Sequence, residues 1–247
     1  MSDVNPYESS TVAGPASSGT QSGRAYSYVS AAGRVSTLII LFVVTGVWHA
    51  VMIGMNLVAV LGDVDAWGEI QLGDMLYPSF WITYAAAGLL ILPIYIATVV
   101  VFCMWVHRSN ANARALGAEG MEFTPGWSVG WFFIPIMNLF KPYQAVREIY
   151  RASDPERGPR DWPLSGNSGA VRLWWTLWIV TNIIDNVESR MGQADDPEML
   201  LVSCWVGVVG SALGILLCLV VANVVRSIQA RLHRKAIQLG AAMEFSD

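Results

Sequence analysis

Two ionisable residues lie within or directly after apolar stretches. An ionisable group inside a membrane is energetically costly and is often functional. His49 lies within a long run that lacks Lys, Arg, Asp and Glu, and Asp185 directly follows the apolar stretch Val171–Ile184. If the helices that carry them pack together, the two side chains form a proton-sensitive intramembrane pair. The alternative is that His49 is a neutral, hydrogen-bonded core residue and that Asp185 lies at the outer interface. The sequence leaves both interpretations open.

A second group of residues is suited to binding anions and to lying at a membrane surface. It occupies segment 125–152 and consists of Pro125, Gly126, Trp127, Trp131, Pro135, Asn138, Lys141, Pro142, Tyr143, Arg147 and Arg151. Guanidinium and ammonium groups bind lipid phosphate, and Trp and Tyr rings prefer the headgroup level. We expect this group to form an interfacial motif.

Catalytic and metal-binding motifs are missing from the sequence. It contains no HExxH, no GxSxG, no P-loop and no paired cysteine ligands. Cys103, Cys204 and Cys218 lie in apolar runs and are interpreted as small buried hydrophobic residues. We therefore expect no catalytic residue, no metal and no cofactor, and the chain is not expected to be an enzyme.

Long apolar stretches must position these residues. Hydrophobic residues make up 54% of the 247 and charged residues only 14%, against about a quarter in soluble domains. Runs 35–61, 80–106 and 199–225 contain no Lys, Arg, Asp or Glu, and each exceeds the ~20 residues that a membrane-spanning helix needs. A shorter stretch, 171–188, is predicted as one more span, which makes four in total and is the third in chain order. Its charged residues are expected to reach the far interface. The predicted class is an all-α, polytopic membrane helix bundle.

Basic residues set the predicted orientation. Every Lys and Arg except Arg190 precedes the first span, separates the second and third, or follows the fourth. The positive-inside rule then places both termini in the cytoplasm. Residues 1–34 are rich in Ser, Gly and Ala and are predicted to be a disordered tail. Residues 35–227 form the expected membrane domain and 228–247 a basic cytoplasmic tail.

The two halves of the membrane domain resemble one another. Setting Gly33 against Gly169 without gaps pairs Val35 with Val171 and brings His49 opposite Asp185. Either the chain contains a two-hairpin internal repeat, as some transporters do, or apolar helices simply share hydropathy. Small residues four apart create faces for bundle or oligomer contacts: Gly46, Ala50 and Gly54 in the first span, and Gly210 and Gly214 in the fourth.

The segment between the second and third spans is expected to enter the membrane without crossing it. Its apolar part, 127–140, is too short to span and is interrupted by Pro135. Proline removes a backbone donor and disfavours helix at Ile134, so a break there needs shelter from protein, water or a side chain such as Asn138. From Pro142 onward the pattern predicts an amphipathic helix at the headgroups. Segment 125–152 is therefore predicted to be re-entrant or interfacial.

The same segment carries a family resemblance. The matching residues are Pro125-Gly126-Trp127, Val129-Gly130, Phe133, Pro135, Asn138-Leu139 and Pro142-Tyr143, preceded by Arg108, Asn112-Ala113-Arg114 and Leu116-Gly117 and followed by Trp174-Trp175. On these residues, over roughly 36–227, the chain resembles the bacterial membrane proteins of domain-of-unknown-function family 4328. The resemblance implies a multi-pass protein of the bacterial inner membrane and supplies no activity, substrate or catalytic residue.

Three functions remain in order of preference. The first is a non-enzymatic module that docks anionic lipid or an envelope protein at the cytoplasmic face, with the lipid bilayer, a membrane-protein partner or a second copy as partners. The alternative is a small-solute or ion transporter or channel that uses the re-entrant segment, and the weakest is an intramembrane enzyme. The formal net charge of −4 gives no reason to expect nucleic acid.

Overall fold

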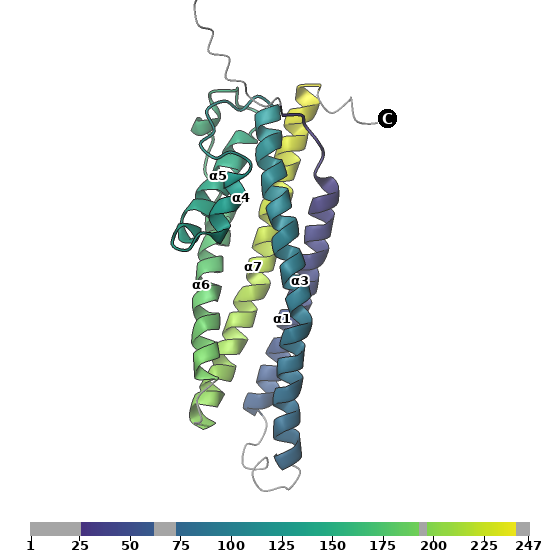
Figure 1. The fold of residues 1–247 in the computed structure, drawn as a ribbon, viewed down its shortest axis with the longest axis vertical. Helices are drawn as coiled ribbons and strands as arrows, with labels where there is room; N and C mark the ends of the chain where they lie inside the picture. Colours follow the sequence, from purple (N-terminus) through teal and green to yellow (C-terminus); the bar gives the residue numbers. More distant parts are fainter. Residues whose placement is uncertain (1–25, 62–72, 193–196, 241–247) are drawn as a thin grey trace, which may run out of the picture.

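The computed structural model describes residues 26–61, 73–192 and 197–240, and the secondary structure within these ranges is entirely helical (Figure 1). In chain order the elements are α1 (Ala32–Leu61), α3 (Gly73–Ala115), α4 (Trp127–Gly130), the 3-10 helices η1 (Trp131–Phe133) and η2 (Met137–Leu139), α5 (Lys141–Ala152), η3 (Trp162–Leu164), α6 (Gly169–Met191) and α7 (Pro197–Gln238). The prediction of an all-α bundle is confirmed.

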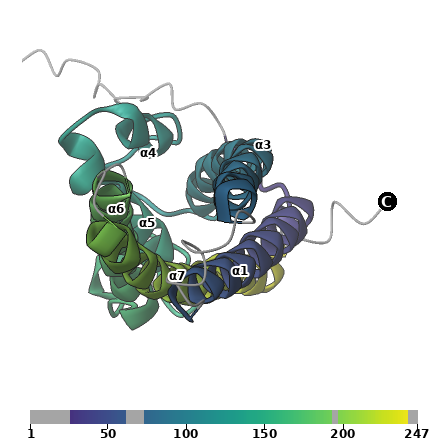
Figure 2. The same ribbon diagram turned by 90° about the horizontal axis from the view of Figure 1, so that it is seen from below.

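The four long helices form an open arc. α1 packs between α3 and α7, and α6 packs on the other side of α7, so the order along the arc is α3, α1, α7, α6 (Figure 2). The helices alternate in direction, and α3 and α7 extend furthest at the end where α4 and α5 lie (Figure 1). We call this end the head; it comprises the last turns of α3 and α7 together with residues 116–168.

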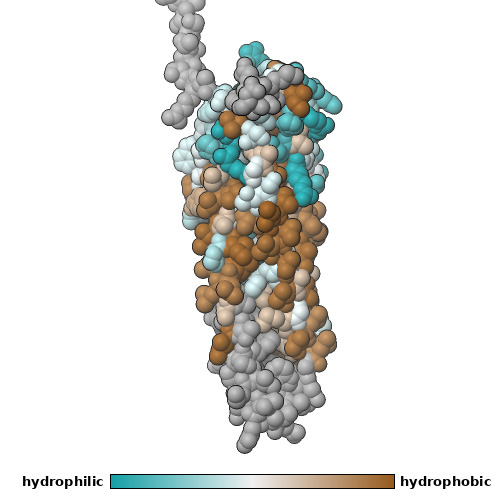
Figure 3. Space-filling model, turned by 90° about the vertical axis from the view of Figure 1, so that its right-hand side faces the viewer, coloured by the Kyte–Doolittle hydropathy of each residue, from teal (hydrophilic) through white to brown (hydrophobic). Residues whose placement is uncertain are grey.

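Three described helices are long and apolar enough to cross a membrane: Ala32–Leu61, Gly88–Ala115 and Leu201–Gln238. Only 17%, 11% and 28% of the residues in their most apolar windows are buried within the protein. Exposed aliphatic surface of this extent would be unstable in water, since soluble monomers rarely expose large apolar patches. A broad hydrophobic band below the polar head is visible in Figure 3. These surfaces are those of a membrane protein.

α6 differs from the other long helices. It covers the predicted span 171–188 but is not among the three helices that meet the length and hydropathy requirements. Its place in the arc also bears on the predicted repeat, which would make α1 and α6 equivalent. α1 has a long helix on each side, whereas α6 lies at the end of the arc (Figure 2). The helix order therefore does not support a two-hairpin repeat.

The best-buried part of the molecule lies in and next to the head. Its core includes Trp105 and Val106 of α3, Ile149 of α5, and Ile228 and Leu232 of α7, all with no exposed surface. Burying these side chains against one another supplies the hydrophobic free energy that apolar contacts cannot provide within lipid. The head is therefore organised like a small soluble core at the end of a membrane bundle.

Both predicted tails are shorter in the structure. At the N-terminal side Tyr28 and Ala31 are buried, and Val29 exchanges two hydrogen bonds with the Asn112 side chain, of 3.1 and 2.9 Å. At the C-terminal side α7 continues to Gln238, eleven residues past the expected end of the membrane domain at 227. The rest of both tails, the acidic loop residues 63–69 and residues 195–196 lie outside the described residues.

Candidate functional site

A tight turn follows α4, as the position of Pro135 predicts. Ile134 is extended (φ −98°, ψ 115°), which is the conformation that a following proline favours. Ile136 has a φ of +68°, an unusual conformation for a β-branched residue. The backbone N–H of Asn138 donates to the Ile134 carbonyl at 2.8 Å, and the Trp175 indole of α6 donates to the Leu139 carbonyl at 3.1 Å. The Asn138 side chain forms no hydrogen bond with another described residue, and its Oδ1 is buried without a partner there.

The turn presents an uncovered apolar edge. Phe133, Ile136, Leu139 and Phe140 are 65%, 71%, 46% and 57% exposed. Trp127, at the start of α4, is also exposed, and its ring lies 4.9 Å from that of Trp131. Hydrophobic side chains gathered in this way on one edge mark a membrane or protein contact. This apolar edge is therefore the most distinctive surface of segment 125–152.

Some cations of the predicted motif already interact with other groups of the protein. Lys141 forms an ion pair with Glu122 at 3.2 Å, and its ammonium group lies over the Phe123 and Trp131 rings. The Arg147 guanidinium lies 5.4 Å from the centre of the Tyr143 ring. Arg151 has a buried Nε without a partner among the described residues. None of the ion pairs among the described residues involves Arg147 or Arg151.

α5 is the predicted amphipathic helix, but its buried face contacts protein and includes an acidic residue. Pro142 occupies its first turn, and Val146 and Ile149 are fully buried. Glu148, which the sequence places on another face, is 8% exposed. Its carboxylate accepts hydrogen bonds from the backbone N–H groups of Glu122 and Phe123 at 2.5 and 3.1 Å. Burial raises the pKa of Glu148, and the two backbone donors and Arg114 oppose that shift.

Polar residues on the last turns of α3 hold the same loop. Asn110 donates to the Phe123 carbonyl at 2.8 Å, and Arg114 donates to the Met121 and Phe123 carbonyls at 3.1 and 2.9 Å. Asn110 and Asn112 are fully buried. The family resemblance includes Asn112 and Arg114 without assigning them a role. In the structure Arg114 fixes the backbone of the loop, and Asn112 fixes the backbone of Val29 ahead of α1. The sequence signal that could have identified them is a group of Asn and Arg side chains directly after an apolar span, because such side chains need hydrogen-bond partners where they are buried.

The end of α7 is bound to α5 by a second polar cluster. The Arg231 guanidinium contacts the Asp154 carboxylate at 3.0 Å and lies 4.3 Å from the Tyr150 ring centre. Lys235, 5% exposed, donates to the Ala152 carbonyl at 3.1 Å. Burial alone would raise the pKa of Asp154, but hydrogen bonds from Ser165 and from the Glu156 backbone, together with Arg231, hold it below its usual value. These basic residues therefore stabilise the packing of α7 against α5 in the head.

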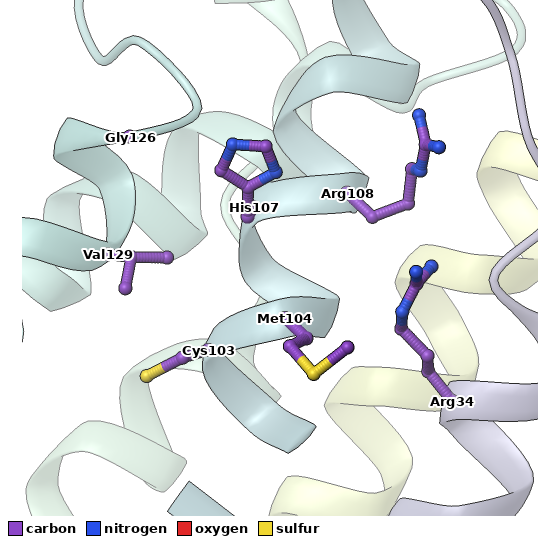
Figure 4. Close-up of a pocket in the computed structure, with 7 residues that line it drawn as sticks. All are labelled: Arg34, Cys103, Met104, His107, Arg108, Gly126 and Val129. Atoms are coloured by element: carbon purple, nitrogen blue, oxygen red, sulfur yellow. The ribbon is translucent and has the colours of Figure 1, made fainter. Parts of the chain in front are cut away.

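An open depression of about 520 Å³ lies where α1, α3 and α4 meet. It is lined by Arg34 of α1, by Cys103, Met104, His107 and Arg108 of α3, and by Gly126 and Val129 at α4. Figure 4 shows Arg34 and Arg108 on the side toward α1, while His107 lies toward Gly126. None of the residues predicted for a transport path, His49, Asp185 or Asn138, lines this depression.

His49 and Asp185 both approach glycines of α7, one helical turn apart. A Cβ atom added at Gly214 would lie 2.5 Å from His49 Nε2, and one added at Gly210 would lie 3.7 Å from an Asp185 oxygen. No hydrogen bond or ion pair joins His49 to Asp185 within the part of the chain that the structure describes. α7 is therefore a shared neighbour of the two side chains.

The small residues of the first and fourth spans have different surroundings. Gly210 and Gly214 are buried in the bundle, with side chains of α6 and α1 against them. A Cβ atom added at Gly46 or Gly54 would have no atom within 4 Å. Within the described ranges, no group of three or more His, Cys, Asp or Glu residues is placed to hold a metal ion.

Comparisons with known proteins identify a family and no characterised relative. No curated protein and no solved structure matches the chain. The model of a domain of unknown function, DUF4328, matches residues 80–230. The match contains most of α3, all of segment 125–152, α6 and most of α7, which supply most of the head and every lining residue of the depression except Arg34. Since this is more than half of the chain, the protein belongs to the DUF4328 family.

Proposed function

We propose that this chain is a non-enzymatic, membrane-embedded module whose head docks onto anionic lipid at the cytoplasmic face. The observation that carries the proposal is the uncovered apolar edge of Phe133, Ile136, Leu139 and Phe140 beside the cations of α5. A surface that joins apolar side chains to arginine and tryptophan suits the boundary between acyl chains and headgroups. An envelope protein is the other occupant with this chemistry.

The proposal includes a bilayer placement. α6 is the third of four spans in chain order: at 23 residues and ~1.5 Å per residue it is long enough for a hydrocarbon core of ~30 Å. Every described basic residue except Arg190 belongs to the head or to helix segments adjoining it. By the positive-inside rule the head then faces the cytoplasm of a bacterial inner membrane, with both termini on that side. Segment 127–140 enters the cytoplasmic leaflet and returns.

Tryptophan quenching tests lipid docking directly. The full chain is reconstituted into phosphatidylcholine vesicles that contain brominated phosphatidylglycerol or brominated phosphatidylcholine at equal mole fraction. We expect the anionic brominated lipid to quench more strongly, because Trp127 and Trp131 pack together and the Lys141 ammonium group lies over the Trp131 ring, in the same segment as Arg147. Arg147→Gln with Arg151→Gln is expected to reduce that difference, whereas Arg157→Gln with Arg160→Gln, at exposed positions outside the motif, leaves it unchanged.

Equal quenching by the two brominated lipids would contradict lipid docking. The protein-docking version is tested by placing a photo-crosslinker at Phe133 or Ile136 in cells. A single crosslinked envelope protein, lost when Arg147 is changed to Gln, would replace lipid as the occupant. Lipid adducts alone would support the proposal as stated.

A transporter is the second candidate, favoured by polar side chains along α7. His49 lies against Gly214, Asp185 lies near Gly210, and a Cβ atom added at Gly207 would lie 2.6 Å from a Glu188 oxygen. Ionisable groups at one small-residue face of a membrane helix are typical of ion or proton pathways. Proton and cation flux into liposomes tests this function. Flux that is absent, or that is unchanged by His49→Ala and Asp185→Asn, would exclude it.

A further inference from the structure

We propose that the depression between α1, α3 and α4 binds the phosphodiester headgroup of an anionic phospholipid whose acyl chain follows α3. The inference rests on the proposed docking function and assigns it a site that shares only Gly126 with the predicted motif. Arg34, Arg108 and His107 are the polar contacts, and Met104 begins the apolar path.

The site is assembled from elements far apart in the sequence. Arg34 lies in the first turn of α1, Arg108 and His107 lie on α3, and Gly126 precedes α4. The cavity volume of about 520 Å³ falls within the ~300–1,000 Å³ of small-molecule sites. Cys103, Met104 and Val129 form its apolar lining (Figure 4). A headgroup that is polar at one end and attached to an acyl chain matches this lining.

The charges of the depression are not compensated by the described protein. The ion pairs found among the described residues use Lys141, Arg160 and Arg231, and neither Arg34 nor Arg108 takes part in one. The first turn of α1 also contains no acidic residue. A cation at a helix N-terminus opposes the helix dipole unless an anion is nearby. A phosphate bound by both guanidinium groups would remove this repulsion.

An apolar track distinguishes a lipid from a free phosphate ion. Met104, Val100 and Ile96 follow one another at four-residue spacing on α3 and are 49%, 51% and 54% exposed. Residues four apart lie on the same face of a helix. The track therefore runs from the depression toward the middle of the hydrophobic band. Its length and direction suit an acyl chain that hangs from a headgroup at Arg34 and Arg108.

Native mass spectrometry of the full chain, delipidated in neutral detergent, tests the site. The titrants are phosphatidylglycerol, phosphatidylcholine with the same acyl chains, and soluble glycerol phosphate. We expect a first phosphatidylglycerol to bind at least ~10-fold more tightly than phosphatidylcholine, and Arg34→Gln with Arg108→Gln to remove that preference. The matched control, Arg226→Gln with Arg234→Gln, changes two exposed arginines outside the depression and should keep it.

A variant that fills the depression distinguishes loss of the binding site from loss of the fold. Gly126 has a helical backbone conformation, and a Cβ atom added there would meet no atom within 4 Å. Gly126→Leu should therefore fold normally, reduce the depression and weaken phosphatidylglycerol binding without changing any charge. Glycerol phosphate binding as tightly as the lipid would contradict the acyl-chain track.

The possible failures identify which claim is wrong. If the unchanged chain shows no preference for the anionic lipid, the proposed docking function fails and the site fails with it. If the preference survives both Arg34→Gln with Arg108→Gln and Gly126→Leu but is lost in Arg147→Gln with Arg151→Gln, docking stands and the inferred site is wrong.

Discussion

Glu148 shows how one polar side chain can organise a membrane-protein head. It lies on the buried face of α5, and its carboxylate binds two consecutive backbone N–H groups of the loop that follows α3. Asn110 and Arg114 bind the carbonyls of the same loop. Together these three residues satisfy backbone groups that would otherwise be buried without partners. The loop is thereby held next to Gly126 and the depression.

Removing the Glu148 carboxylate should destabilise the head. Glu148→Ala leaves the N–H groups of Glu122 and Phe123 without their acceptor, so we expect a loss of about 3 kcal/mol of unfolding free energy. The matched control is Glu122→Ala, which removes only the ion pair between Glu122 and Lys141 and should cost less than ~1 kcal/mol. Thermal unfolding in detergent, followed by tryptophan fluorescence, measures both. Equal losses would show that the Glu148 hydrogen bonds do not support the head.

The raised pKa of Glu148 also predicts a pH dependence. The folded chain holds its proton to higher pH than the unfolded chain does, whose Glu titrates near 4.5. The unfolding free energy should therefore fall as the pH rises from about 4.5 through the folded pKa. Glu148→Gln does not titrate, so its midpoint temperature should fall less over this range than that of the unchanged chain. Parallel pH profiles would assign the dependence to other groups.

At the scale of helices, close packing in the bundle depends on glycines of α7. His49 of α1 occupies the space in which Gly214 has no side chain. Gly214→Ala should destabilise the bundle by about 1–3 kcal/mol, because the new methyl group would overlap the imidazole ring. His49→Ala in the same chain should restore part of the loss, since the two sites are in contact.

Gly46→Ala is the matched control for this pair. Gly46 also lies within a span, but a Cβ atom there would meet no atom within 4 Å. We expect no destabilisation, and helix propensity alone favours alanine by up to ~1 kcal/mol. Unfolding midpoints of the three variants in detergent decide the outcome. Destabilisation by Gly46→Ala as large as that by Gly214→Ala would mean that the exposed face of α1 has a partner in another copy.

Helices and their interruption were predictable because their causes are local. An uncharged run such as 35–61 or 199–225 has one stable form in lipid, and the structure contains a helix at each. The break near Pro135 follows from a missing donor and a steric clash. The extension of α7 into the head was missed because Lys235 reads as a tail residue, and its partner Ala152 lies 83 positions away.

The candidate site was predicted only in part, because it also depends on contacts between residues far apart in the sequence. The sequence placed aromatic and basic residues in segment 125–152, and the structure brings several of them to one edge. The buried role of Glu148 was not predicted, because helical spacing alone does not show that its neighbours are backbone donors. From the sequence, Arg34 contributes only to the predicted orientation, and Arg108 to the orientation and the family resemblance. Their common depression depends on how α1 packs against α3, which no local pattern specifies.

On the scale of the whole molecule, the head and the open arc combine two kinds of packing. The head is held by a hydrophobic core and by hydrogen bonds between distant segments. The arc beneath it exposes most of its apolar side chains, so lipid must complete its surface. The placement of the arc in the membrane depends on α6. If α6 crosses the bilayer, its two ends lie in different aqueous compartments.

Cysteine labelling across α6 tests this placement. In a chain with Cys103, Cys204 and Cys218 changed to alanine, single cysteines are introduced at Glu156, before α6, and at Arg190, near its far end; both positions are exposed. If α6 crosses the membrane with the head in the cytoplasm, a membrane-impermeant maleimide should label Arg190→Cys in intact spheroplasts and Glu156→Cys only in inverted vesicles. Labelling of both positions from one side would mean that α6 does not cross. The arc would then have three spans, and the apolar edge and the depression would need a different position relative to the lipid.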